Sequence, residues 1–235
     1  MQDRSASALY PRADLYFALA LLTAIIGFYP SYFGRLTQTD VAHHFHGLTA
    51  TAWMLLLITQ GWLFRQRRWT LHRRLGRGSL LLAPLFLVSG LLMIHAMLRS
   101  ANGFSQTFGA RLAFVDMTTL AYFALAYGLA IRWRKNRPIH ARLMASTAVL
   151  VLPPALARVL AGLVPGITSF ASAFNWSYII TELIVLALII HDVRSDRWRA
   201  PYPALLALLF VQHLSFGVTP TVTGWSRLCA WVGTI

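Results

Sequence analysis

Long apolar runs recur along this chain and limit the class of fold that it can adopt. Each run has about 17–22 residues, the length that an α-helix needs to cross a hydrocarbon core roughly 30 Å thick. Because a bilayer offers no water to backbone N–H and C=O groups, each run must form a helix that satisfies its own hydrogen bonds. The sequence therefore predicts an all-α, polytopic integral membrane bundle. Seven transmembrane helices are expected, near residues 15–33, 43–64, 79–98, 112–131, 143–163, 176–191 and 203–219.

The sixth and seventh runs are the weakest, since both contain polar residues, and six spans is the alternative count. The composition, 57% hydrophobic and 12% charged, agrees with a bilayer environment. No long polar linker interrupts the runs, so we expect a single transmembrane helical domain over 1–235, with small outer loops at 99–111 and 164–175. Pro84 and the Pro153-Pro154 pair are expected to kink their helices. The first run lacks a signal-peptide cleavage site and is expected to remain as an anchor.

Basic residues gather at one end of the predicted bundle. Segments 1–14, 65–78, 132–142 and 192–202 hold 2, 6, 5 and 3 of the 21 lysines and arginines. Because loops rich in Lys and Arg stay on the cytoplasmic side, the N-terminus is expected in the cytoplasm and the C-terminus outside. The net charge of +14 then belongs to loops, and no nucleic-acid partner is expected. The loop RQRRWTLHRR is expected to meet anionic membrane lipids.

A weak internal repeat relates two of the basic loops. Residues 62–81, WLFRQRRWTLHRRLGRGSLL, and 129–148, LAIRWRKNRPIHARLMASTA, each pass from an apolar run through a basic loop to a His-x-Arg-Leu sequence. The repeat predicts that His72 and His140 occupy corresponding inner ends of two helices. Beyond His72, the same helix face carries small residues that allow close approach of another helix or of a flat cofactor. They are Gly76, Ser79, Ala83 and Gly90.

The segment VAHHFHGLTATA places three histidines where the second apolar run begins. His46, Trp53 and Gln60 are seven residues apart, so they share one helix face, which is expected to point into the bundle. His43 lies three residues before His46 on a similar face. We therefore expect two of the three histidines to aim at the bundle and the third to lie at the interface.

Ionisable side chains from several predicted helices fall in the outer half of the bundle. A charge at mid-membrane costs at least ~2.5–3.5 kcal/mol, so such residues are expected to pair or to serve a site. Asp116 with Arg158 is the preferred ion pair, and Glu182 with His213 is a possible second. The alternative is that these pairs only hold helices together. The residues expected in this layer are His43, His46, His95, Asp116, Arg158, Glu182 and His213.

Four motifs, HHFHGLTATAW, ITQGWLFRQRRWTLHRRLGR, RPIHARLMA and LARVL, resemble a family of bacterial multi-helix membrane proteins. The family features correspond to His46-Gly47, Trp53, Gln60, residues 72–76 and residues 140–144. The resemblance covers roughly residues 28–160 well and implies a fold but no activity. With the charge pattern, it predicts a multi-pass protein of the bacterial cytoplasmic (inner) membrane.

The chain is more distantly similar to membrane cytochromes of the diheme b type, which bind haem through paired histidines on adjacent helices. This similarity implies haem b, with His46, His72, His95 and His140 as the cofactor-binding residues. His72 and His95 share a helix but are 23 residues apart, about 34 Å, so that one helix cannot offer both to stacked haems. A haem would instead bridge helices, as between His72 and His140, or between His46 and either His95 or His213.

Three functions remain open from the sequence, and whether the chain is an enzyme is one of the open points. The first is a b-haem or quinone-linked electron-transfer protein. The second is a membrane enzyme with zinc or iron, for which imidazole and carboxylate ligands are suited. The third is a non-catalytic transporter, lipid binder or accessory subunit of a larger membrane complex. The metal ligands of the second function would come from His43, His46, His95, Asp116, Glu182 and His213.

Overall fold

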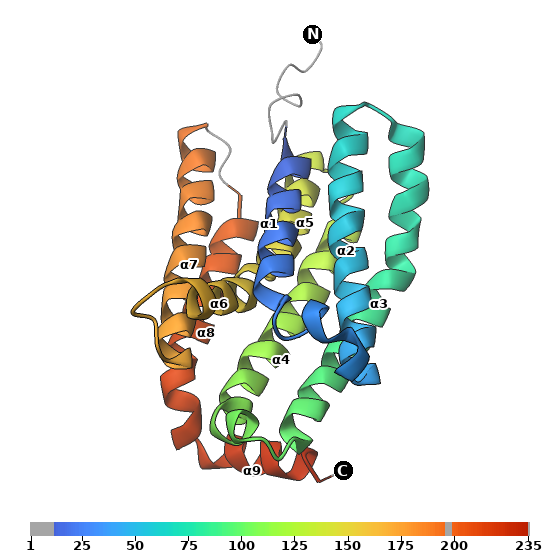
Figure 1. Cartoon of the computed structure of the whole chain (residues 1–235). Helices are drawn as coiled ribbons and strands as arrows, with labels where there is room; N and C mark the ends of the chain where they lie inside the picture. Colours follow the sequence, from blue (N-terminus) through green and yellow to red (C-terminus); the bar gives the residue numbers. More distant parts are fainter. Residues whose placement is uncertain (1–11, 196–198, 235) are drawn as a thin grey trace.

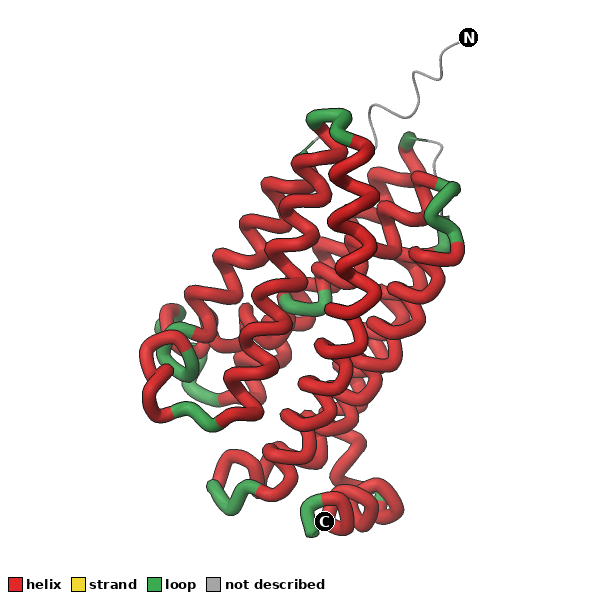
Figure 2. The backbone as a smooth tube through the Cα atoms, turned by 90° about the vertical axis from the view of Figure 1, so that its right-hand side faces the viewer, coloured by secondary structure: helices red, strands yellow, loops and turns green. Residues whose placement is uncertain are grey.

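The computed structural model describes residues 12–195 and 199–234, and all regular structure in those ranges is helical (Figures 1 and 2). The all-α prediction is therefore confirmed. Six segments are long and apolar enough to cross a membrane. They are α2 (Val41–Arg65), α3 (Trp69–Arg99), α4 (Gly103–Arg132), α5 and α6 together (Arg137–Leu163), α7 (Phe170–Arg194), and α8 with the short helix η3 (Pro201–Thr221).

The first predicted span is the short one. Helix α1 (Ala13–Phe28) has 16 residues, about 24 Å, which is less than a hydrocarbon core of ~30 Å. It ends ahead of Pro30, after which the chain turns into a 3₁₀ helix, η2 (Phe33–Gln38). The first predicted span is therefore the one that is shorter than the hydrocarbon core, whereas the sixth and seventh predicted spans form long helices. The number of long apolar helices among the described residues is six. Helix α1 still packs closely on α6, where a Cβ on Gly27 would come within 2.4 Å of the Ala155 carbonyl oxygen.

Several helices extend beyond the apolar runs because polar residues cap them. Asn102 accepts a hydrogen bond from the Ser105 N–H at the start of α4, and Ser169 accepts one from the Ser172 N–H at the start of α7. The expected outer loops at 99–111 and 164–175 are therefore too long. The chain between the helices there is reduced to residues 100–102 and 164–169.

The expected kink at Pro153-Pro154 is confirmed as a complete break. The single span predicted near 143–163 consists of α5 (Arg137–Val149) and α6 (Leu152–Leu163). Proline has no N–H, so Val149 and Leu150 lose the donors that would continue the helix. Figure 1 shows α6 turned across the direction of α5 and leading toward α7. Helix α3, in contrast, continues through Pro84.

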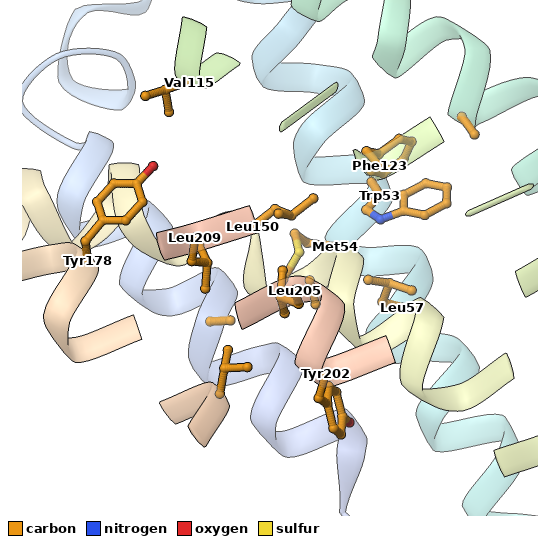
Figure 3. Packing of buried hydrophobic residues seen from close by; sticks show 14 of the residues in the cluster. Trp53, Met54, Leu57, Val115, Phe123, Leu150, Tyr178, Tyr202, Leu205 and Leu209 are labelled. Carbon is orange, nitrogen blue, oxygen red and sulfur yellow. The ribbon is translucent and has the colours of Figure 1, made fainter. Parts of the chain in front are cut away.

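The largest buried cluster centres on α2, α4, α5, α7 and α8. Trp53 is 2% exposed, and its ring lies edge-on to that of Phe123, with centroids 4.8 Å apart (Figure 3). Leu57, Leu205 and Leu209 pack in the same cluster. The inward face predicted for α2 is therefore the face on which neighbouring helices assemble.

The two ends of the bundle differ in composition. The turns α2–α3 and α4–α5 carry arginines and lie at one end, which we call the basic end (Figure 1). At the opposite end α9 (Thr223–Val232) lies across the bundle, a helix that the sequence did not predict (Figure 1). The Trp225 indole N–H donates to the Ala110 carbonyl at 2.7 Å and fastens α9 to α4. The cytoplasmic location of the basic end stays a prediction.

Candidate functional site

The polar stripe of α2 reaches three different neighbours. The His46 ring is hydrogen-bonded to the Ser89 hydroxyl of α3 at 3.1 Å. The Trp53 indole N–H donates to the Thr147 hydroxyl of α5 at 3.2 Å. Near the basic end, the Gln60 amide donates to the His72 carbonyl of α3 at 3.1 Å. These contacts fix α2 against α3 and α5 at three depths.

The other two histidines at the start of α2 face away from the bundle interior. His43 is 44% exposed and its ring lies 2.7 Å from Asp40, the N-cap residue of α2. Partial burial raises the pKa of the Asp40 carboxyl, but hydrogen bonds from the His43 N–H and ring outweigh it and hold that pKa below its usual value. His44 contacts Tyr32 of the preceding segment at 3.3 Å. Of the three histidines, only His46 is hydrogen-bonded to another long helix, because Asp40 binds His43 and Tyr32 binds His44.

Glu182, His213 and Asn175 form a compact polar group between α7 and α8. The His213 Nδ1 lies 3.1 Å from the Glu182 carboxylate, and its Nε2 lies 2.8 Å from the Asn175 side-chain oxygen. His213 and Glu182 are both largely shielded, with side-chain exposures of 19% and 17%. The structure thus brings together the second of the two expected pairs.

Asp116 on α4 and Arg158 on α6 interact without touching. Both lie in the described part of the chain, yet no Arg158 nitrogen comes within 4.0 Å of the Asp116 carboxylate, and the two charges attract through space. The Arg158 guanidinium donates to the Pro154 carbonyl at 2.8 Å and lies 4.2 Å from the centre of the Phe28 ring. Both side chains are exposed. This combination therefore leaves each charge able to bind another group.

A neighbouring network was not predicted. The Tyr178 hydroxyl of α7 donates to the Gln212 side-chain oxygen of α8 at 3.1 Å. The Gln212 amide in turn donates to the hydroxyls of Thr118 and Thr119 on α4, each at 2.9 Å. Gln212 is 1% exposed, so this network holds α4, α7 and α8 together inside the bundle. The sequence signal was a glutamine within an apolar run, next to His213.

A second ion pair missed in the sequence lies toward the basic end. Arg142 of α5 donates through Nε and Nη2 to the two carboxylate oxygens of Asp192 on α7, at 2.5 and 2.7 Å. The side chains are 1% and 3% exposed. Asp14 and Arg65 form a further pair at 2.7 Å that links α1 to α2. Sequence reasoning had assigned Arg142, Asp192 and Arg65 to loops, because helices were drawn only over the apolar runs.

His72 and His140 occupy equivalent positions at the basic end. Each is the fourth residue of its helix, α3 and α5, and each backbone N–H bonds to the residue that caps the helix. The guanidinium of Arg137 lies 5.2 Å from the centre of the Trp69 ring, so a side chain from the first turn of α5 reaches the first turn of α3. The internal repeat is therefore also a repeat in space.

The hydrogen bonds of these two histidines differ. The His140 Nδ1–H donates to the Ala130 carbonyl at 2.9 Å, which leaves Nε2 free of that bond. The His72 Nδ1 is buried and has no hydrogen-bond partner among the described residues, and the same holds for the Gln60 side-chain oxygen. Buried polar atoms without partners are uncommon in proteins.

The remaining predicted ligands stay apart. His95 is partly buried on α3, whereas His213 is bonded on the α7–α8 side and His46 on the α2–α3 side. Among residues 12–195 and 199–234, no three histidine, cysteine, aspartate or glutamate side chains are grouped so that they could hold a metal ion.

Comparison with known proteins gives no match, whether to family models, to curated proteins or to solved structures.

Proposed function

We propose that this chain is a membrane-embedded redox protein that holds a b-type haem between His72 and His140. The observation that carries the proposal is the pairing itself: two histidines on different helices occupy equivalent first turns at the basic end, and Arg137 of one turn contacts Trp69 of the other. Axial ligation by two imidazoles is an established way to hold haem iron. When bound, such a haem accepts and returns single electrons.

The nitrogen atoms of the two rings fit this role. The Ala130 carbonyl accepts from the His140 Nδ1–H, which sets the tautomer and leaves Nε2 as the ligand atom. For His72 the same support is within reach, because its unpartnered Nδ1 and the unpartnered Gln60 oxygen are both buried, and Gln60 already bonds to the His72 backbone. We expect the Gln60 oxygen to accept from the His72 Nδ1–H when Nε2 binds iron.

The surroundings also suit a flat group with acidic substituents. At Gly76, one turn beyond His72, an added Cβ would meet only the Gln60 amide nitrogen, at 3.4 Å. Ser79 and Tyr127 contribute a hydroxyl pair 2.9 Å apart farther along α3. The exposed guanidinium groups of Arg73 and Arg137 lie at the same end and are suited to haem propionates.

The test is an absorption spectrum of chain purified from haem-replete cells, together with a haem assay. We expect a Soret band at about one haem per chain, lost in His72→Ala and in His140→Ala. The matched control is His43→Ala, which removes an exposed histidine bonded to Asp40 and should keep the band. A colourless native protein, or full haem content in both ligand variants, would contradict the proposal.

A second candidate is a non-catalytic transport or binding role centred on Glu182 and His213. The observation that favours it is that His213 has an oxygen atom against each ring nitrogen, so the group is able to hold a proton beside a carboxylate. Chain reconstituted in liposomes with an internal pH dye tests it. Faster proton entry that is lost in Glu182→Gln would support this role, and equal rates in native, variant and empty liposomes would exclude it.

A further inference from the structure

The turn between α2 and α3 forms a shallow, open hollow at the basic end. Its volume is about 430 Å³, and it is lined by Arg67, Arg68, Trp69, Thr70, Leu71 and Arg73. All three arginines are exposed. Nothing in the proposed redox role uses Arg67 or Arg68, so this hollow requires its own explanation.

The charge of the hollow is not balanced by the protein. Within the described residues, no acidic side chain forms an ion pair with Arg67, Arg68 or Arg73. Asp14 and Asp192, the acidic side chains nearest this end in the helices, are already bonded to Arg65 and Arg142. The hollow is therefore complementary to an anion.

Two tryptophans place the hollow at the level of lipid headgroups. Arg68 lies 5.4 Å from the centre of the Trp62 ring, and Arg137 lies 5.2 Å from that of Trp69. Tryptophan prefers the interface between hydrocarbon and water, so the guanidinium groups stacked on these rings lie at the depth of phosphates. Arg137 of the second basic turn thus contacts Trp69, one of the residues that line the hollow.

The lining combines charge with apolar surface. Trp69 contributes to its wall and Leu71 is 45% exposed there. A free inorganic anion would not contact the apolar side chains, whereas a phospholipid has a charged headgroup for the arginines and acyl chains for the apolar side chains. Arg67 also has a φ of 57°, a left-handed backbone conformation that glycine or asparagine ordinarily takes. Arg67 thus places a positive charge at a position where the backbone conformation favours an uncharged residue.

We propose that this hollow binds the headgroup of an anionic phospholipid, with Arg67, Arg68 and Arg73 around the phosphate and Trp69 and Leu71 against the first part of the acyl chains. This site differs from a general electrostatic attraction between basic loops and the membrane, because it binds one lipid molecule at a defined position. It shares Arg73 with the haem proposal, but Arg67 and Arg68 belong to the lipid site alone, and lipid binding is measured separately from haem content.

Native mass spectrometry of the full chain in a zwitterionic detergent tests the site, by titration with phosphatidylglycerol and with phosphatidylcholine. We expect one phosphatidylglycerol to bind preferentially. The triple variant Arg67→Gln/Arg68→Gln/Arg73→Gln should bind it on the order of 100-fold more weakly, since each basic residue near a membrane surface contributes roughly fivefold. The variant Arg132→Gln/Arg134→Gln/Lys135→Gln removes the same charge from the other turn and should stay within about twofold.

Two further variants separate binding from folding. Arg67→Gly relieves the left-handed conformation, so it should leave the thermal unfolding temperature unchanged or raised while it weakens lipid binding roughly fivefold. Arg67→Lys/Arg68→Lys/Arg73→Lys keeps the charge and should retain most of the affinity. Equal weakening in the control triple variant, equal binding of phosphatidylcholine, or displacement of the lipid by an equal concentration of inorganic phosphate would overturn the proposal.

Discussion

Two of the arginine–aspartate combinations between helices are opposite in kind. Arg142 and Asp192 are buried, in two-point contact, and join α5 to α7. Asp116 and Arg158 are exposed, belong to α4 and α6, and interact only through space. A buried charge is tolerated only when a partner compensates it, so the first combination has a structural role. The second leaves its charges accessible and is the better candidate for binding another group.

The difference extends to the polar groups around each pair. Toward the basic end, helix contacts rest on charges that satisfy one another, such as Asp14 with Arg65. Toward the opposite end, α4, α7 and α8 are joined by the neutral Tyr178–Gln212 network. Asp116, which forms no contact ion pair, is therefore not needed to join α4 to α7 and α8.

The largest effect is expected from Arg142→Met. The substitution leaves Asp192 buried without its two-point partner, so the free energy of unfolding should fall by about 3–5 kcal/mol. Titration of the folded chain with SDS in mixed micelles, followed by circular dichroism, measures this change. Adding Asp192→Leu should recover most of the loss, because apolar residues replace a buried ion pair at little cost. A loss below about 1 kcal/mol in the single variant would contradict the structural role.

A smaller effect is expected from Gln212→Leu. It removes the hydrogen bonds to Tyr178, Thr118 and Thr119 and should lower the free energy of unfolding by about 1–2 kcal/mol, in line with interhelical hydrogen bonds in membranes. The same SDS titration measures it. The neighbouring exposed residue gives a control, Val211→Leu, which should change little. If Gln212→Leu lowered the free energy of unfolding as much as Arg142→Met, the neutral network and the buried ion pair would not differ in their contribution to stability.

The smallest effect is expected from Asp116→Asn. Because Asp116 makes no contact ion pair, the free energy of unfolding should change by less than about 0.5 kcal/mol. Stabilisation by roughly 2–3 kcal/mol would instead show that the carboxylate faces lipid, where removing a charge is favourable. A double-mutant cycle with Arg158→Gln sharpens the comparison, since its coupling should be well below that of Arg142 with Asp192.

Much of the fold was predictable from local properties. The apolar runs predicted the all-α membrane bundle, and the seven-residue spacing predicted that Trp53 faces inward, where it is 2% exposed. The consecutive prolines predicted the break between α5 and α6, because a missing N–H acts on its own helix. The repeat predicted the equivalent ends of His72 and His140.

Pairings between distant segments were less predictable. The sequence favoured Asp116 with Arg158 because both seemed to lie in the outer half, and it passed over Arg142 and Asp192, which seemed to lie in loops. Helix α7 in fact continues to Arg194, so that Asp192 is still helical and is carried to Arg142. Helix α9 was missed because its ten residues are too few to cross a membrane.

By itself, the sequence determined that the chain is an all-α bundle, which end is basic and which face of α2 is turned inward, since these depend on hydrophobicity and on the 3.6-residue period of a single helix. Only the tertiary structure decided which charges meet. A contact such as Arg142 with Asp192 requires two helices to agree in depth and in rotation about their axes, and both are set by the packing of many other side chains.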